Sequence, residues 1–157
     1  MELEYARIKP HHGKIGILAE ECESYSFDMI ALTELHWIGQ GKVIMVMKHG
    51  KWKIIIFSGT ENNRREKTVG LMLSTRAARA LLSFECISER LMIARFKCSH
   101  TKLTVVVCYA STNSETRPNY IADKDNFYNQ LEDVTSSIPK HDVEYVWNPV
   151  MKGGSML

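Results

Sequence analysis

The chain has 157 residues, of which 45% are hydrophobic and 24% are charged. These values are typical of one soluble globular domain with its own core, and the length is short for two. The net charge of +2 excludes the bulk basic excess of general nucleic-acid binders, so any nucleic-acid role must depend on a local site. No apolar run approaches the roughly 20 residues of a membrane span. Because the N-terminus, Met1-Glu2-Leu3-Glu4, carries two acidic residues and lacks an apolar signal segment, we expect an intracellular protein, cytoplasmic or nuclear, with no membrane partner.

The first elements in chain order are an expected helix and an expected strand. Residues 14–26 carry apolar side chains at helical spacing, and these are Ile15, Leu18, Ala19 and Cys22. The apolar run 27–32 has the length of a strand and leads into the polar pair Thr33 and Glu34. Sites in α/β folds gather at the carboxyl ends of strands. The pattern therefore places Glu34 at the edge where a site would form.

The middle of the chain is rich in β-forming residues. Strands are predicted at 43–47, 52–57 and 69–73, and the short spacings between them indicate antiparallel hairpins. Ser74 is placed to cap a short helix over 76–82. Two further adjacent strands are predicted at 91–96 and 103–109.

The last elements are a second long helix and a final strand. Residues 123–138 form a helical stripe that Pro139 stops. A strand follows at 142–147. The whole chain is therefore interpreted as one α/β domain in which helices flank mixed sheets.

Four cysteines occur, and none belongs to a CxxC pair. They are Cys22, Cys86, Cys98 and Cys108. Each lies in an apolar segment, where a thiol behaves as a small hydrophobic group. We expect buried free thiols in a reducing compartment, while disulfides or metal ligation stay open as alternatives.

Several sequence blocks, in this order along the chain, carry a resemblance to a known family. They are residues 28–37, 56–59, 69–74, 77–82, 89–96, 105–112 and 125–131, preceded by Gly13-Lys14-Ile15. The series resembles the endonuclease/exonuclease/phosphatase superfamily, and within it the branch of craniofacial development protein 2-like proteins and non-LTR retrotransposon endonucleases. The resemblance extends over residues 13–147.

The resemblance implies a fold and an activity. The fold is a four-layered α/β sandwich of two mixed or antiparallel sheets flanked by helices, here partial and truncated at the C-terminus. Residues 1–157 would form a single incomplete domain. The implied activity is Mg²⁺-dependent phosphodiester hydrolysis of nucleic acid, with DNA as the partner.

Two residues match positions of the family's site. Glu34 matches its metal-binding glutamate, and a hard cation does prefer a fixed carboxylate oxygen. Tyr109 matches a tyrosine whose hydroxyl contacts phosphate. The alternatives are a solvated glutamate at a loop start and a half-buried tyrosine that caps the core. Trp37 matches a tryptophan that we interpret as packing.

Other positions depart from the family's pattern. Tyr5 stands where the family has a metal-site Asn, and Pro149 and Met151 stand where it has a water-activating Asp and an Asn. The C-terminal "S-D-H" motif is absent, and we interpret His100 and His141 as surface residues rather than substitutes. Because each lost group commonly costs about a hundredfold or more in rate, the departures predict that hydrolysis is lost.

A small basic cluster in the loop 60–67 is a candidate nucleic-acid contact. It consists of Arg64, Arg65 and Lys67, which suit phosphate oxygens. The interleaved Glu61 and Glu66 favour the alternative of a solvated loop.

The leading interpretation of the whole sequence is thus a degenerate, inactive endonuclease-like domain. The alternatives are a non-catalytic nucleic-acid- or protein-binding domain derived from that fold, and a truncated gene product.

Overall fold

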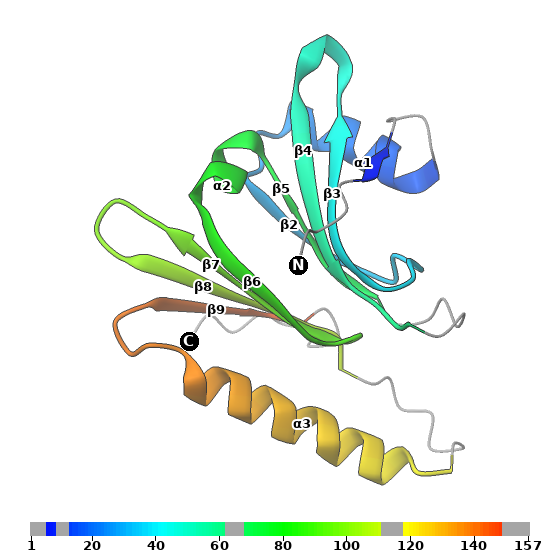
Figure 1. Ribbon diagram of the computed structural model, residues 1–157, viewed down its shortest axis with the longest axis vertical. Helices are drawn as coiled ribbons and strands as arrows, with labels where there is room; N and C mark the ends of the chain where they lie inside the picture. The colour runs from blue at the N-terminus through cyan, green and yellow to red at the C-terminus, as the bar shows by residue number, and fades with distance from the viewer. Residues whose placement is uncertain (1–5, 9–12, 62–67, 111–117, 149–157) are drawn as a thin grey trace.

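The computed structural model describes residues 6–8, 13–61, 68–110 and 118–148 (Figure 1). The elements in chain order are β1 (Ala6–Ile8), α1 (Gly13–Ser24), β2 (Met29–Thr33), β3 (Gln40–Val46), the 3-10 turn η1 (Lys48–Gly50), β4 (Trp52–Ser58), β5 (Val69–Leu73), α2 (Thr75–Ala80), β6 (Leu81–Ser88), β7 (Leu91–Lys97), β8 (Lys102–Cys108), α3 (Tyr120–Ser137) and β9 (Val143–Trp147).

The described strands form two mixed sheets. The first has the order β1-β3-β4-β5-β2 and the second the order β6-β7-β8-β9. Neighbours within each sheet are antiparallel, except that β1 runs parallel to β3 and β9 parallel to β8. The β3–β4, β6–β7 and β7–β8 hairpins agree with the short spacings in the sequence.

The two sheets face each other, and each carries one long helix on its outer side (Figure 1). Helix α1 packs on the five-stranded sheet through Ala19, which contacts a cluster containing Met45 and Met72. Helix α3 packs on the four-stranded sheet through Phe127 and Val134, beside Leu91 and Val106 of that sheet and other residues. The expected four-layered α/β sandwich is therefore confirmed.

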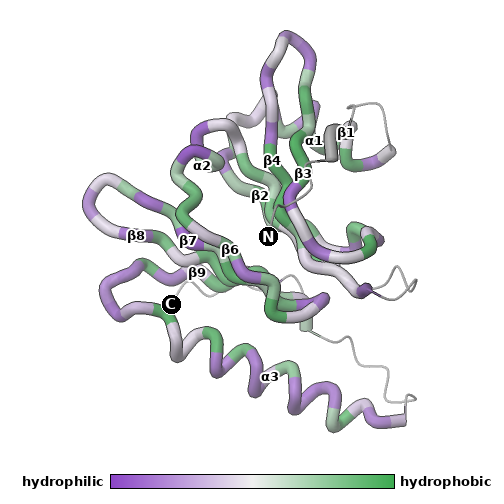
Figure 2. The backbone as a smooth tube through the Cα atoms, in the orientation of Figure 1, coloured by the Kyte–Doolittle hydropathy of each residue, from purple (hydrophilic) through white to green (hydrophobic). Residues whose placement is uncertain are grey.

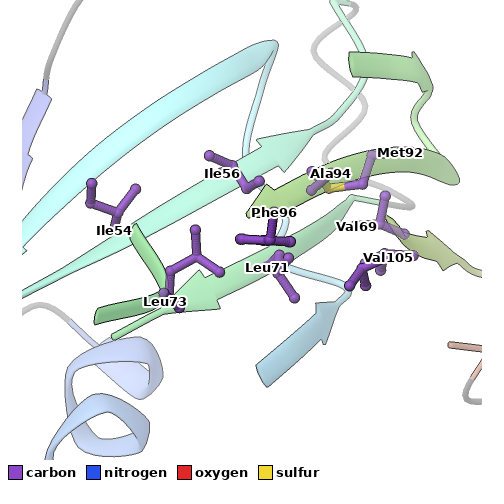
Figure 3. Packing of buried hydrophobic residues seen from close by; sticks show 11 residues of the cluster. Ile54, Ile56, Val69, Leu71, Leu73, Met92, Ala94, Phe96 and Val105 are labelled. Atoms are coloured by element: carbon purple, nitrogen blue, oxygen red, sulfur yellow. The ribbon is translucent and has the colours of Figure 1, made fainter. Parts of the chain in front are cut away.

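The main core lies between the two sheets. Figure 3 shows side chains from β4 and β5 of one sheet directed toward β7 and β8 of the other. Strand β5 is buried at all five residues, which explains its continuous apolar sequence. Burial on both faces removes the alternation that a half-exposed strand would show.

Helix α3 is amphipathic, and Figure 2 shows hydrophobic and hydrophilic residues alternating along it. Phe127 and Val134 are its buried residues. Their separation of seven positions corresponds to about two helical turns, so both lie on the face that covers the sheet.

Most predicted elements differ from the observed ones by a few residues at their ends, and one prediction is wrong in the type of structure. The helix expected over 76–82 ends at Ala80, and Leu81 begins a strand, β6, that the sequence interpretation missed. Leu81 pairs with Phe96 of β7, so the tertiary contact with the neighbouring strand decides its conformation. The cap is confirmed, because the Ser74 hydroxyl accepts a hydrogen bond from the Ala77 N–H at 3.1 Å.

The prediction of buried free thiols is confirmed in part. All four cysteines are free, and Cys22 and Cys108 are buried. Cys86 is half-buried and Cys98 is exposed. Cys98 departs from the prediction because it belongs to the β7–β8 turn, where its N–H donates to the Thr101 carbonyl. Among the described helices, none is long and apolar enough to cross a membrane.

Candidate functional site

Several strands from both sheets terminate at one end of the sandwich. In the five-stranded sheet, Thr33 at the end of β2 and Ser58 at the end of β4 each lie opposite Val69. In the four-stranded sheet, β6 and β8 end opposite Leu91. The Ser58 hydroxyl donates across the sheets to the Ser88 carbonyl at 2.7 Å. This shared edge is the place where Glu34 and Tyr109 meet.

Glu34 and Tyr109 are joined by a hydrogen bond between the two sheets. Glu34 follows β2 directly, and Tyr109 follows β8. The Tyr109 hydroxyl donates to Glu34 Oε1 at 2.7 Å. The two residues are 75 positions apart in sequence, so the fold itself assembles the pair. Both residues that the resemblance nominated therefore lie in one place.

The backbone of the loop that carries Glu34 is unusual. Glu34 and His36 both have positive φ values, 54° and 55°, a conformation that non-glycine residues seldom adopt. Side-chain exposure alternates along the loop. Glu34 and His36 are exposed, whereas Leu35 and Trp37 pack against the cluster under α1. Such strained residues persist only where their surroundings hold them in place, and they concentrate at functional sites.

The loop that carries Glu34 packs closely against two glycines, Gly59 and Gly70. A Cβ on Gly70, the second residue of β5, would lie 2.7 Å from the Leu35 side chain, and a Cβ on Gly59 would lie 2.6 Å from the Trp37 carbonyl. A side chain at Gly59 would meet backbone, whereas one at Gly70 would have to displace the Leu35 side chain. The loop backbone is fixed further by a hydrogen bond from the Thr68 hydroxyl to the Trp37 carbonyl at 3.0 Å.

Trp37 acts in packing, as expected. Its ring meets that of Phe57 edge-on with a centroid separation of 4.9 Å. This contact anchors the far end of the Glu34 loop on β4. Glu34 thus projects from a segment with a defined position rather than from a free loop.

Tyr109 has the core-capping role that was one of the two alternatives from the sequence, and its contact with phosphate stays a prediction. Its ring packs against the main core, while its hydroxyl reaches Glu34. The hydrogen bond to Glu34, assisted by burial, raises the pKa of the Tyr109 phenol, and the charge of Arg90 acts in the opposite direction. At neutral pH the phenol is therefore a protonated hydrogen-bond donor.

Arg90 is a third member of the site that the sequence interpretation did not nominate. It lies in the β6–β7 turn, and its carbonyl accepts a hydrogen bond from the Tyr109 N–H at 2.9 Å. Within the described part of the chain, its Nε is the buried side-chain polar atom that lacks a hydrogen-bond partner. Buried polar atoms are nearly always paired, so an unpaired one requires an explanation. A guanidinium beside Tyr109 suits an anion.

Glu34 offers a carboxylate to a cation at this site. Across the described ranges, no three His, Cys, Asp or Glu side chains lie close enough together to hold a metal ion. Mg²⁺, however, is often bound by one or two carboxylates and completes its octahedral shell with water and substrate phosphate. The donor set of Glu34 fits that mode of binding.

The other residues nominated from the sequence are placed as follows. His100 and His141 are exposed, as expected, and lie at the opposite end of the four-stranded sheet from Tyr109. The basic cluster of Arg64, Arg65 and Lys67 lies outside the described residues, as do Tyr5, Pro149 and Met151.

Comparison with known proteins identifies one kind of relative. The chain is similar to craniofacial development protein 2 of Bos taurus, with 27% identity over 140 residues, and to craniofacial development protein 2 of Tragulus javanicus, with 26% identity over 140 residues. Each alignment covers 87% of this chain but only 22% of the relative. The chain therefore corresponds to less than a quarter of the length of these relatives. No protein-family model matches the chain.

Proposed function

We propose that this chain is a domain derived from the endonuclease/exonuclease/phosphatase fold that binds the phosphodiester backbone of nucleic acid, with DNA as the expected partner, and does not hydrolyse it. The single observation that carries the proposal is the hydrogen bond between Glu34 and Tyr109 across the two sheets. An origin in that fold is what the sequence resemblance implies, and the similarity to craniofacial development protein 2 over most of the chain agrees with the branch that the resemblance named.

Each of the three residues has a part in binding phosphate. The Tyr109 hydroxyl, which now donates to Glu34, can donate to a phosphate oxygen instead. Arg90 supplies a cation with an unpaired Nε, and guanidinium groups suit phosphate geometry. Glu34 by itself would repel a phosphate, so binding requires a cation between the two anions.

Mg²⁺ is the cation that we propose for this position. Glu34 would provide one protein oxygen, and water and the phosphate would provide the others. When bound, Mg²⁺ neutralises charge on the phosphate. Because a single carboxylate anchors it, we expect Mg²⁺ and DNA to bind cooperatively rather than Mg²⁺ to bind tightly alone.

Hydrolysis needs in addition a base that activates water, and the two described residues Glu34 and Tyr109 do not suit this role. The pKa of Tyr109 is raised, so the phenol keeps its proton at neutral pH. Glu34 already accepts a hydrogen bond and is assigned to the cation. Pro149 occupies the position at which the family carries its basic Asp, and proline has no side-chain base. Loss of a general base commonly costs about a hundredfold to ten-thousandfold in rate.

The first test is a plasmid-nicking assay with Mg²⁺, comparing the wild-type chain with Glu34→Ala. We expect equal, background-level nicking by both proteins. Robust nicking that Glu34→Ala abolishes would show a competent enzyme and refute the loss of hydrolysis.

The second test is DNA binding, measured by fluorescence anisotropy with and without Mg²⁺. We expect Mg²⁺ to strengthen binding of the wild-type chain, and Glu34→Gln to remove this enhancement. Tyr109→Phe, which deletes one hydrogen bond to a charged group, should weaken binding by about tenfold. Glu132→Gln on the exposed surface of α3 is the matched control and should change nothing. If the affinity for DNA changes neither with Mg²⁺ nor in either site variant, the proposed site is disproved.

A further inference from the structure

A surface hollow of about 500 Å³ lies far from Glu34, at the opposite end of the four-stranded sheet. Its lining residues come from β6, from the β7–β8 hairpin and from the connection before β9, and they are Leu82, Lys97, Cys98, His100, Thr101, Lys102 and His141. Lys102 begins β8 whereas Tyr109 follows its end. At about 3.3 Å per residue, the two sites are roughly 20 Å apart, too far for one phosphate to touch both.

Two lysines face each other in the lining of the hollow. Lys97 and Lys102 are directly opposite in the β7–β8 ladder, and like charges in this position destabilise a sheet. Within the described residues, neither lysine forms an ion pair with a carboxylate. The fold therefore keeps a repulsive pair without a protein counterion, and an anionic ligand would neutralise it.

None of the described residues that line the hollow is a carboxylate. The nearest in sequence, Asp142, has a side chain with no exposed surface and accepts hydrogen bonds from Arg95 and Thr104. Its Oδ1 also lies 3.5 Å from Nε2 of His141, a lining residue. The walls of the hollow are held together, because the Thr101 hydroxyl donates to the His141 carbonyl at 2.9 Å. In Figure 1 the β7–β8 turn and the start of β9 lie next to each other. The two loops that border the hollow are therefore joined by a hydrogen bond.

A metal site is the obvious competing interpretation, since Cys98, His100 and His141 are all potential ligands. However, no three such groups lie close enough to share an ion anywhere in the described segments. The polar groups that remain in the lining are the two lysine ammonium groups and the imidazole of His100, since His141 Nε2 already lies 3.5 Å from Asp142 Oδ1. This set complements an anion rather than a cation.

We propose that this hollow binds the phosphate group of a nucleotide or nucleic-acid ligand, through Lys97 and Lys102. Lysine ammonium groups are compact point charges that commonly bind phosphate. The volume is within the range of small-ligand sites. The site rests on observations separate from those at Glu34 and needs no metal ion.

The test follows backbone amide shifts by NMR while inorganic phosphate, and then 5′-phosphorylated oligothymidylate, is added without Mg²⁺. We expect saturable shifts at residues 97–102 and at His141. Lys97→Gln combined with Lys102→Gln should weaken phosphate binding by about tenfold or more. The matched control is Lys124→Gln on the exposed surface of α3. It removes one positive charge away from the hollow and should leave phosphate binding unchanged.

The two ligands distinguish the sources of the phosphate. Tighter binding of the oligonucleotide assigns the hollow to nucleic acid, and equal affinity assigns it to a phosphomonoester. Sodium chloride at the same ionic strength should not reproduce the shifts. Identical shifts with chloride, or undiminished binding by the double variant, would overturn the proposal.

Two further variants distinguish phosphate binding in the hollow from binding at Glu34 and from a loss of stability. Glu34→Gln should leave phosphate binding in the hollow unchanged, so failure at one site is distinguishable from failure at the other. Lys102→Gln alone relieves like-charge repulsion, so its melting temperature should equal or exceed that of the wild-type chain. A loss of phosphate binding without a loss of stability is the result expected of a ligand contact. If Lys102→Gln melts at a clearly lower temperature, the lysine pair is structural and the proposal fails.

Discussion

Strands β5 and β9 have the same length and a similar share of apolar residues, yet they are held by different forces. Strand β5 has the sequence VGLML, and all five residues are buried. Strand β9 has the sequence VEYVW, and four of its five residues are exposed. Strand β5 lies between β4 and β2, whereas β9 pairs with β8 alone among the described strands. Apolar content thus gives burial only where neighbours cover the strand.

Strand β9 is attached by a polar network at its start. Asp142 accepts hydrogen bonds from Arg95 Nε at 2.6 Å, Arg95 Nη2 at 2.8 Å and the Thr104 hydroxyl at 2.8 Å. Its neighbour Val143 is 54% exposed. Strand β5 is thus held mainly by burial, whereas β9 is held by its pairing with β8 and, at its start, by this carboxylate. Each contribution can be tested by itself.

The largest expected effect is at the centre of β5. Leu71 is 1% exposed and belongs to the main core between the sheets. Leu71→Ala deletes buried methyl groups and leaves a cavity, so we expect the free energy of unfolding to fall by about 2–5 kcal/mol. Chemical denaturation measures this change.

The matched control for Leu71→Ala is the same substitution at Leu82 in β6, which is 49% exposed. We expect a loss of no more than about 0.5–1 kcal/mol there, since surface substitutions usually have small effects. Equal losses at the two positions would mean that burial does not distinguish the strands, and the comparison would be wrong.

The same contrast explains how much of the fold the sequence predicted. The bounds 69–73 of β5 were predicted correctly, because a short continuous apolar run between polar loops favours a buried strand. Strand β6 was missed, because Leu81 and Leu82 continue the helical pattern of α2 and only pairing with β7 makes them extended. The local sequence pattern therefore predicts secondary structure well where a strand is buried throughout. It predicts poorly where pairing with a distant strand determines the conformation.

The candidate site was predictable to a similar extent. Glu34 was found by its position after a strand and, like Tyr109, by the family resemblance. Arg90 was missed, because nothing in the sequence indicates that a turn between two strands will reach Tyr109. Gly70 did offer a signal, since a glycine inside a strand often marks a close approach. The sequence cannot reveal that Leu35 is the group that approaches.

The next largest effect is expected at the polar anchor of β9. Asp142→Asn removes the negative charge but keeps the shape, so Arg95 loses its ion pair. We expect hydrogen exchange of the β9 amides to accelerate by about tenfold, while the amides of β5 change less. Glu144→Gln, an exposed residue within β9, is the control and should leave exchange unchanged. Uniform acceleration across both strands would show that β9 is not a separate unit of stability.

The smallest expected effect is the loss, in acid, of what this anchor contributes to stability. Hydrogen bonds from Arg95, with help from Thr104, lower the pKa of Asp142 from 3.8 to about 2. Because the folded pKa lies below the ordinary value, the carboxylate stabilises the fold fully above about pH 4. This contribution is lost as the pH falls from about 4 to 2.

Other carboxylates also weaken the fold in this acid range, since hydrogen bonds with Lys53 and Arg76 lower the pKa values of Glu23 and Asp28. The informative quantity is therefore the difference in melting temperature between the wild-type chain and Asp142→Asn. This difference should be largest near pH 5 and should shrink toward pH 2, because the wild-type Asp142 then becomes neutral like the Asn. A difference that stays constant over this range would show that the charge of Asp142 contributes nothing. Strand β9 would then be attached by its backbone pairing with β8 and by the shape of its side chains, as β5 is attached by burial.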